Sequence, residues 1–224
     1  MDCYTSLAGG YDSLTEDVQY EKRAAFLQKL LAKSTIPVHT VLDLACGTGT
    51  MTCLLAEAGY EMIGVDLSED MLSEAAGKTV SPGKIPPIYL QQSMEELDLY
   101  GTVEAAVCCL DSINYLTDAR ALKRALQRLH LFVAPGGVFL FDVNTPCKLR
   151  SLDGQVFLDE REDLYCVWRA DFDRRSRICT YGMDIFERQG TLWRRSLEEH
   201  REKAWEVEEL KRFLTAYYNL KFNK

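Results

Sequence analysis

The chain has 224 residues, 47% of them hydrophobic, and a formal net charge of −8. It is long and apolar enough for one large domain, or a domain with a small insertion, around a sizeable core. The negative charge disfavours a nucleic-acid backbone as the main partner, because phosphates need a basic face. No apolar stretch approaches the length of a membrane span and the N-terminus is polar and short, so we expect a soluble cytoplasmic protein without a membrane partner.

The eight cysteines include no C-x-x-C pair. Because the sequence shows neither this metal-ligand spacing nor a secretory signal, we expect reduced thiols, most of them small core residues, and no metal site. The cysteines lie at positions 3, 46, 53, 108, 109, 147, 166 and 179.

Residues 1–15 hold two aromatic residues, Tyr4 and Tyr11, and from the sequence we expect them to form a flexible start. One interpretation of Tyr11 is a core filler that packs its ring under the first helix. Apolar residues at helical spacing predict this first helix over 17–33.

The chain is organised around the stretch 41–49. Its first four residues are typical of a short buried strand and include one carboxylate, Asp43. Gly47 and Gly49 then turn the backbone into a helix that begins near Thr50. Such a junction presents backbone N–H groups and a helix N-terminus to a polar ligand.

A second predicted strand, 62–66, ends in Asp66, about 20 residues after the glycine turn. At this spacing in a βαβ unit, a carboxylate grips the ribose of a bound nucleoside. The turn and the carboxylate together predict a cofactor that contains a nucleoside.

The residues near the turn discriminate between such cofactors. A dinucleotide motif would need a third glycine where Thr52 stands, and a phosphate-binding P-loop would need a lysine, although none lies between Lys33 and Lys78. Asp43 would repel a pyrophosphate but suits a cationic amino-acid end. These facts favour S-adenosylmethionine (SAM), whose sulfonium and ammonium groups are positive.

Three more predicted strands alternate with helices along the first two thirds of the chain. A helix follows Ser68, which is a plausible N-cap, and another begins at 117–118 and is closed by 135–137. This alternation predicts an α/β fold with a doubly wound, mostly parallel sheet. The third, fourth and fifth strands are predicted at 88–92, 103–110 and 138–141.

From Thr145 onward the hydrophobic period changes to two, which predicts antiparallel strands. Three strands are expected, at about 164–172, 179–185 and 192–200. We therefore expect 146–203 to form a small antiparallel β lid, inserted after the fifth strand, and 1–145 with 204–224 to form the SAM-binding domain. The last part should contain a helix over 207–217 and the start of a strand at 219–223.

Five stretches of the sequence resemble the class I SAM-dependent methyltransferases, as does an N-terminal pattern of Tyr4, Tyr11 and Asp12. They occur in the family's order and, with that pattern, cover roughly two thirds of the chain. The stretches are DLACGTG (43–49), VDLSEDML (65–72), QQSMEELDL (91–99), AVCCLDSINYL (106–116) and LFVAPGGVFLFDVNTP (131–146).

The resemblance implies a role for each matched position in holding SAM. The N-terminal tyrosine segment folds over the cofactor. Asp43 holds the ammonium through water or the loop N–H groups, unless it is an acid that only tightens the turn. Asp66 accepts hydrogen bonds from both ribose hydroxyls, unless it is a surface acid at a strand end. The implied cofactor residues are Tyr11, Asp43, Leu44, Ala45, Gly47, Gly49, Asp66, Leu67, Ser93, Met94 and Leu110.

Adenine is expected beside Ser93 and the backbone N–H of Met94. Family members usually carry Asp at the position of Ser93, which can accept a hydrogen bond but has no charge. Leu110 is expected just after the fourth strand, beside the position of the methyl group.

Two residues are candidates for catalysis. Asp111 lies beside the expected methyl position, where it could also cap the next helix. His200 could act as a general base, or it could be solvated like the rest of the charged run 198–212. Trp168 and Trp193 are expected in the lid core.

We therefore expect a methyltransferase that moves a methyl group from SAM to an N or O nucleophile of a small molecule, mainly by proximity and orientation. Two alternatives remain open. An RNA methyltransferase is disfavoured by the acidic charge and by the absence of the Asn/Asp-Pro-Pro-aromatic signature. A SAM-binding module without turnover is suggested because we expect the family's last strand to be absent from this sequence. We expect a monomer or a homodimer: the sequence is truncated, a partner subunit supplies the sheet edge, or the sheet is short with an exposed edge.

Overall fold

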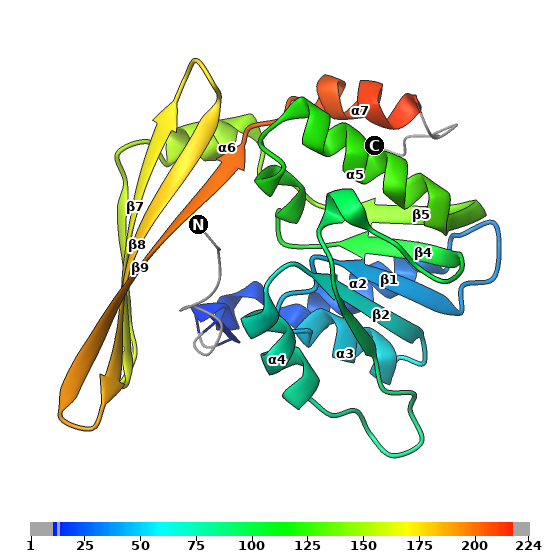
Figure 1. The fold of residues 1–224 in the computed structure, drawn as a ribbon, viewed down its shortest axis with the longest axis horizontal. Helices are drawn as coiled ribbons and strands as arrows, with labels where there is room; N and C mark the ends of the chain where they lie inside the picture. The colour runs from blue at the N-terminus through cyan, green and yellow to red at the C-terminus, as the bar shows by residue number, and fades with distance from the viewer. Residues whose placement is uncertain (1–10, 13, 217–224) are drawn as a thin grey trace.

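The computed structural model describes residues 11, 12 and 14–216, which form two β-sheets (Figure 1). The larger sheet has the strand order β3-β2-β1-β4-β5, and every neighbouring pair is parallel. This order confirms the predicted doubly wound sheet, with its switch point between β1 and β4. The strands are β1 (Thr40–Leu44), β2 (Glu61–Asp66), β3 (Ile88–Gln91), β4 (Val103–Cys108) and β5 (Val133–Phe141).

Helices cover both faces of this sheet, because its strands bury side chains on both sides. Val41 packs in a cluster with α2 (Tyr20–Leu31) and α3 (Thr50–Glu57). Its neighbour Leu42 points the other way, into a cluster with α5 (Ala119–Phe132) and α7 (Val207–Thr215). The remaining helical segments on this sheet are α4 (Glu69–Gly77), η1 (Glu16–Val18), η2 (Met94–Glu96) and η3 (Ser112–Tyr115).

The second sheet is antiparallel, has the order β6-β7-β8-β9, and stands beside the larger one (Figure 1). It follows β5 and the short α6 (Pro146–Ser151), as expected for the lid, and we call it the lid sheet. It contains a strand that the sequence pattern did not predict, β6, whose apolar residues Val156 and Leu158 are exposed at the sheet edge. The strands are β6 (Val156–Glu160), β7 (Leu164–Asp173), β8 (Ile178–Gln189) and β9 (Leu192–Lys203).

The fifth strand begins earlier than predicted. It includes Pro135, Gly136 and Gly137, which were expected to close the preceding helix. Proline is tolerated because β5 is an edge strand in the described part of the sheet. Gly136 has a φ of 86°, and the pairing with β4 shifts register between Val103 and Ala105, as a bulge requires.

The two terminal helices also differ in extent from the prediction. The first is interrupted at Gln19, where φ is 57°, and only Tyr20–Leu31 is α-helical. The final helix ends at Thr215. The strand predicted at 219–223, and Tyr4 of the N-terminal pattern, lie outside the described residues.

Candidate active site

The turn between β1 and α3 uses backbone in the left-handed region. The φ angle is 61° at Ala45, 54° at Gly47 and 71° at Gly49. A Cβ on Gly49 would lie 2.5 Å from the hydroxyl oxygen of Tyr89, so this position requires glycine. The turn places the first N–H groups of α3 at the carboxyl edge of the sheet, where a helix N-terminus can bind a polar ligand.

Asp66 ends β2 beside this turn. One carboxylate oxygen accepts the Gly47 N–H at 2.8 Å, and the other accepts the Ser68 N–H at 2.9 Å. Burial raises the pKa of Asp66, and these backbone donors oppose the rise. The two bonds orient the carboxylate while its further lone pairs remain available for two hydroxyl groups, as the predicted ribose contact requires.

Asp43 lies deeper, with 2% of its surface exposed. Its carboxylate accepts a hydrogen bond of 2.6 Å from the hydroxyl of Thr52, in the first turns of α3. Burial raises the pKa of Asp43 to about 6, the Thr52 hydrogen bond opposes this, and the charge of Asp66 adds to it. The side chain therefore ties strand to helix and contributes negative charge beneath the glycine turn.

The N-terminal segment joins the glycine turn to the lid sheet. Asp12 accepts hydrogen bonds from the hydroxyls of Thr48 (2.6 Å) and Thr50 (3.1 Å), and Lys78 Nζ lies 2.5 Å from its other oxygen. Tyr11 packs against the lid cluster around Met183. The segment thus crosses the carboxyl edge of the sheet.

The chain is strained immediately after β4. Leu110 and Asp111 have φ angles of 55° and 53°, which non-glycine residues rarely adopt, and such backbone often marks a functional site. The Asp111 N–H donates to Asp142 at 3.1 Å. The Asp111 side chain makes no capping bond to η3, so the capping alternative is wrong. Burial raises the pKa of Asp111, and the charge of Asp142 raises it further.

Three ionisable residues of β9 face inward, contrary to the prediction of a solvated run. Glu198, His200 and Glu202 are exposed by only 8%, 2% and 4%. Because side chains alternate along a strand, all three lie on the face of the lid sheet that meets the larger sheet. Their spacing was the signal for this face, but charged residues are normally placed in solvent.

His200 connects the two sheets through hydrogen bonds. Its Nδ1 lies 3.1 Å from the hydroxyl of Tyr115 at the end of η3, and its Nε2 lies 2.9 Å from a carboxylate oxygen of Glu198. The sequence-based analysis named His200 but missed Tyr115 and Glu198.

Glu202 belongs to a second polar cluster, which the sequence-based analysis also missed. It accepts a hydrogen bond of 2.7 Å from Asn144, and its side chain interacts with Asp111 and Tyr181. Burial raises the pKa of Glu202, and the charge of Asp111 adds to the rise. Asn114 anchors this cluster, since its amide donates to the carbonyls of Asn144 and of Lys203.

The two tryptophans of the lid differ from each other. Trp193 is 48% exposed, so its predicted place in the lid core is wrong. Trp168 packs in the inner lid cluster with Tyr11, and its indole Nε1 is buried without a hydrogen-bond partner among the described residues. An unpaired buried donor is uncommon and points to a missing polar partner, such as a ligand or water.

The predicted adenine-binding residues lie at the far end of the same edge. Ser93 follows β3 and donates its hydroxyl hydrogen to Glu96 at 3.2 Å, and Met94 begins η2. Leu67 follows Asp66 and is 68% exposed. The side chains of His, Cys, Asp and Glu in the described residues form no group that could hold a metal ion.

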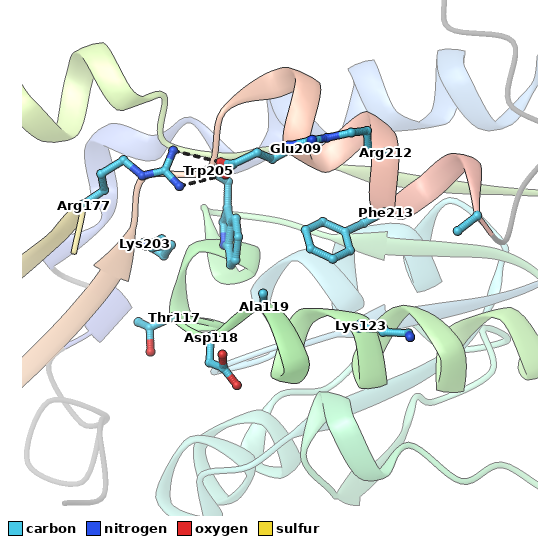
Figure 2. Close-up of a pocket in the computed structure, with 11 residues that line it drawn as sticks. Thr117, Asp118, Ala119, Lys123, Arg177, Lys203, Trp205, Glu209, Arg212 and Phe213 are labelled. Atoms are coloured by element: carbon cyan, nitrogen blue, oxygen red, sulfur yellow. Dashed lines mark hydrogen bonds and ion pairs between the residues drawn. The ribbon is translucent and has the colours of Figure 1, made fainter. Parts of the chain in front are cut away.

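A surface pocket of about 700 Å³ lies elsewhere, between α5, α7 and the end of β9 (Figure 2). The guanidinium of Arg177 donates to both carboxylate oxygens of Glu209, at 3.0 and 2.8 Å, and Lys203 lies 5.7 Å from the centre of a Trp205 ring. The lining of this pocket includes none of the predicted cofactor residues.

The glycine turn after β1, the carboxylate that ends β2 and the switch point between β1 and β4 define an α/β protein that binds a nucleoside cofactor. Residues 41–137 match the family described as "Methyltransferase domain". The chain is 32% identical over 213 residues to YqeM of Bacillus subtilis (strain 168), whose name places it among the methyltransferases, covering 94% of this chain and 84% of that protein. This chain belongs to the class I SAM-dependent methyltransferases.

Solved structures agree with this assignment. A SAM-dependent methyltransferase from Clostridium acetobutylicum superposes with a TM-score of 0.83 at 31% identity, over 100% of this chain and 95% of that one. DesVI from Streptomyces venezuelae shares the fold, with a TM-score of 0.80 at 22% identity over 97% of this chain and 91% of that one. Across the described part of the chain, no helix combines the length and apolar character needed to cross a membrane.

Proposed function

We propose that this enzyme methylates an N or O nucleophile of a small molecule, held between the carboxyl edge of the larger sheet and the inner face of the lid sheet. One observation carries the proposal: Glu198, His200 and Glu202 are buried on the lid face that meets Asp111 and Tyr115. A polar surface between two sheets suits a small polar molecule, and the carboxylates of Asp111, Glu198 and Glu202 on it disfavour a polynucleotide.

In this proposal the predicted residues hold SAM along the edge from β3 to β4. Asp66 binds the ribose of SAM, the glycine turn and Asp43 bind its amino-acid end, and the segment at Ser93 binds its adenine. When bound, SAM supplies an electrophilic methyl group on its sulfonium, and transfer of this methyl group leaves a neutral thioether. The protein's own part is to orient the acceptor and exclude water.

The lid, 146–203, is proposed to select the acceptor together with the segment that carries Tyr11. The indole N–H of Trp168, which has no hydrogen-bond partner in the described part of the chain, suits an acceptor with an oxygen atom that receives a hydrogen bond. Both acceptor types occur among the names of relatives, one in each of two proteins. Ubiquinone biosynthesis O-methyltransferase of Methylococcus capsulatus is 31% identical over 170 residues, covering 74% of this chain and 68% of that protein. A dTDP-3-amino-3,6-dideoxy-alpha-D-glucopyranose N,N-dimethyltransferase of Streptomyces fradiae is 31% identical over 124 residues, covering 55% of this chain and 46% of that protein.

The test is a transfer assay with SAM tritiated at the methyl group. Purified protein is incubated separately with the metabolite, RNA and protein fractions of a cell extract, and the label is counted in each. We expect label in the metabolite fraction, lost in Asp66→Asn and retained in Asp163→Asn, whose side chain is 73% exposed on the lid. Label confined to RNA or protein would contradict the proposal.

A further inference from the structure

A hydrogen-bonded chain of three side chains runs from the larger sheet into the lid. Tyr115 ends η3, which follows the strained residues after β4, and its hydroxyl lies 3.1 Å from His200 Nδ1. His200 Nε2 lies 2.9 Å from Glu198. The phenol and imidazole rings meet edge to face, with centroids 5.9 Å apart and planes at 90°.

The chemistry of the three groups sets which atom donates and which accepts in each of these hydrogen bonds. With Glu198 ionised, its carboxylate only accepts hydrogen bonds, and the adjacent His200 nitrogen, Nε2, then carries the proton. The other nitrogen, Nδ1, is then an acceptor, and the Tyr115 hydroxyl must donate to it. A phenolic oxygen that donates one hydrogen bond can in addition accept a hydrogen bond from another N–H or O–H through its lone pairs.

The surroundings hold Tyr115 and His200 in this arrangement. Asn114, the neighbour of Tyr115, is fully buried and bonds to the carbonyls of Asn144 and Lys203, which fixes η3 against the lid sheet. Among the described residues, the titratable groups that face His200 include Tyr115 on η3, Tyr181 opposite it on β8, and Glu198 and Glu202 on β9, with Asp111 beyond Glu202.

We propose that Tyr115 is the catalytic base of the methyl transfer, and that His200 and Glu198 are positioning residues that act through it. This rests on the proposed function, because it needs an acceptor between the two sheets. Tyr115 suits the role by position: it follows the end of β4 at the switch point of the sheet, where ligands of this fold bind. The acceptor must then present an N–H or O–H group, which the phenolic oxygen recognises.

The proton balance is simple. As the acceptor atom bonds to the methyl carbon, the electron pair of the broken S–C bond stays on sulfur, and one proton is left in excess on the acceptor. That proton passes to the oxygen of Tyr115, while the hydroxyl proton of Tyr115 passes to His200 Nδ1. Glu198 stabilises the imidazolium, which later releases its proton to solvent.

The first test reads the tautomer of His200 by ¹⁵N NMR in the full-length protein with S-adenosylhomocysteine bound. The chain has three histidines, so comparison with His200→Gln assigns the signals. We expect protonated Nε2 and hydrogen-bonded, unprotonated Nδ1. A proton on Nδ1 would overturn the proposal, because Tyr115 could then not pass its proton to His200. This result does not depend on knowing the acceptor.

The second test uses the labelled transfer into the metabolite fraction. Tyr115→Phe should be roughly 100-fold slower, as for loss of a general base, with unchanged affinity for S-adenosylhomocysteine. Glu198→Gln should shift the acid limb of the pH–rate profile, and Glu199→Gln, on the exposed face of the same strand, should not. A wild-type rate in Tyr115→Phe, or an unmoved profile in Glu198→Gln, would refute the relay. Absence of any transfer by the wild type would refute the proposed function instead, and the tautomer would still decide the relay.

Discussion

Two carboxylates at the ends of neighbouring strands are held in different ways. Asp66 is bound by two backbone N–H groups beside the glycine turn. Asp43 is buried under the turn and bound by the hydroxyl of Thr52. The sequence predicted that both acids belong to the site, because their spacing from the glycines is visible. The partner of Asp43 could not be read in the same way, since Thr52 was noticed only as the residue in place of a third glycine.

Thr52→Val tests the cost of keeping Asp43 charged. Valine has a similar volume, but the buried carboxylate loses a donor, so we expect a loss of about 1–3 kcal/mol in unfolding free energy. The pKa of Asp43 is about 6 and should rise further in the variant. The charged form is therefore the destabilised one, and the loss should be larger above this pKa than below it.

Urea unfolding of Thr52→Val at about pH 5 and about pH 8 measures this difference. Thr102→Val, at an exposed position, serves as the control for the change of side chain. An equal loss at both pH values would mean that the hydroxyl matters for packing and not for the charge of Asp43.

At the scale of elements, the two glycines of the β1–α3 turn serve different needs. Both have positive φ, but a Cβ on Gly49 would overlap the Tyr89 hydroxyl and lie 2.9 Å from Ala75 Cβ, whereas a Cβ on Gly47 would have no atom within 4 Å. The space beside Gly47 is where SAM is proposed to approach the backbone.

Alanine at each position should separate these needs. Gly47→Ala should lose about 1–2 kcal/mol of stability from backbone strain, yet also bind SAM weakly because the new methyl group occupies the approach. Gly49→Ala should lose about 1–3 kcal/mol more, because the overlap forces neighbours to move. Urea unfolding and calorimetric titration with SAM measure the two effects. Equal stability losses, or intact SAM affinity in Gly47→Ala, would contradict this division.

Strand β9 was predicted from the sequence, but the face of it that is buried was not. The lid and its antiparallel strands follow from the period of two, but the alternating charges in 198–202 favoured a solvated strand end. The structure buries Glu198, His200 and Glu202 and leaves Glu199 and Arg201 exposed. A periodic pattern shows that two faces differ, but it does not show which face meets another element when both carry charge.

At the scale of the whole molecule, the site is assembled from distant segments. Asp111, Asn144 and Glu202 come from the end of β4, the end of β5 and the lid, and they meet only because the lid sheet docks against η3. The order of the five-stranded sheet was predictable from strand–helix alternation. The docking of the lid was not, because it depends on contacts between residues nearly 90 positions apart, such as Asn114 with Lys203.

This assembly should make stability depend on pH through Glu202. Burial, followed by the charge of Asp111, raises the pKa of Glu202 in the folded protein. The native state therefore holds a proton that the unfolded chain has already released, so the free energy of unfolding should fall as pH rises from the ordinary carboxyl range through the raised pKa of Glu202.

Glu202→Gln resembles the protonated side chain, because its amide can still accept a hydrogen bond from Asn144 and donate one to Asp111. We expect it to flatten this decline and to be more stable than the wild type by about 1–3 kcal/mol at about pH 8, and similar to it at about pH 5. Urea unfolding across this range, with Glu199→Gln as the exposed control on the same strand, measures the effect. An unchanged slope in Glu202→Gln would mean that Glu202 is ionised in the native protein and that the contact with Asp111 is held by a proton on Asp111 instead.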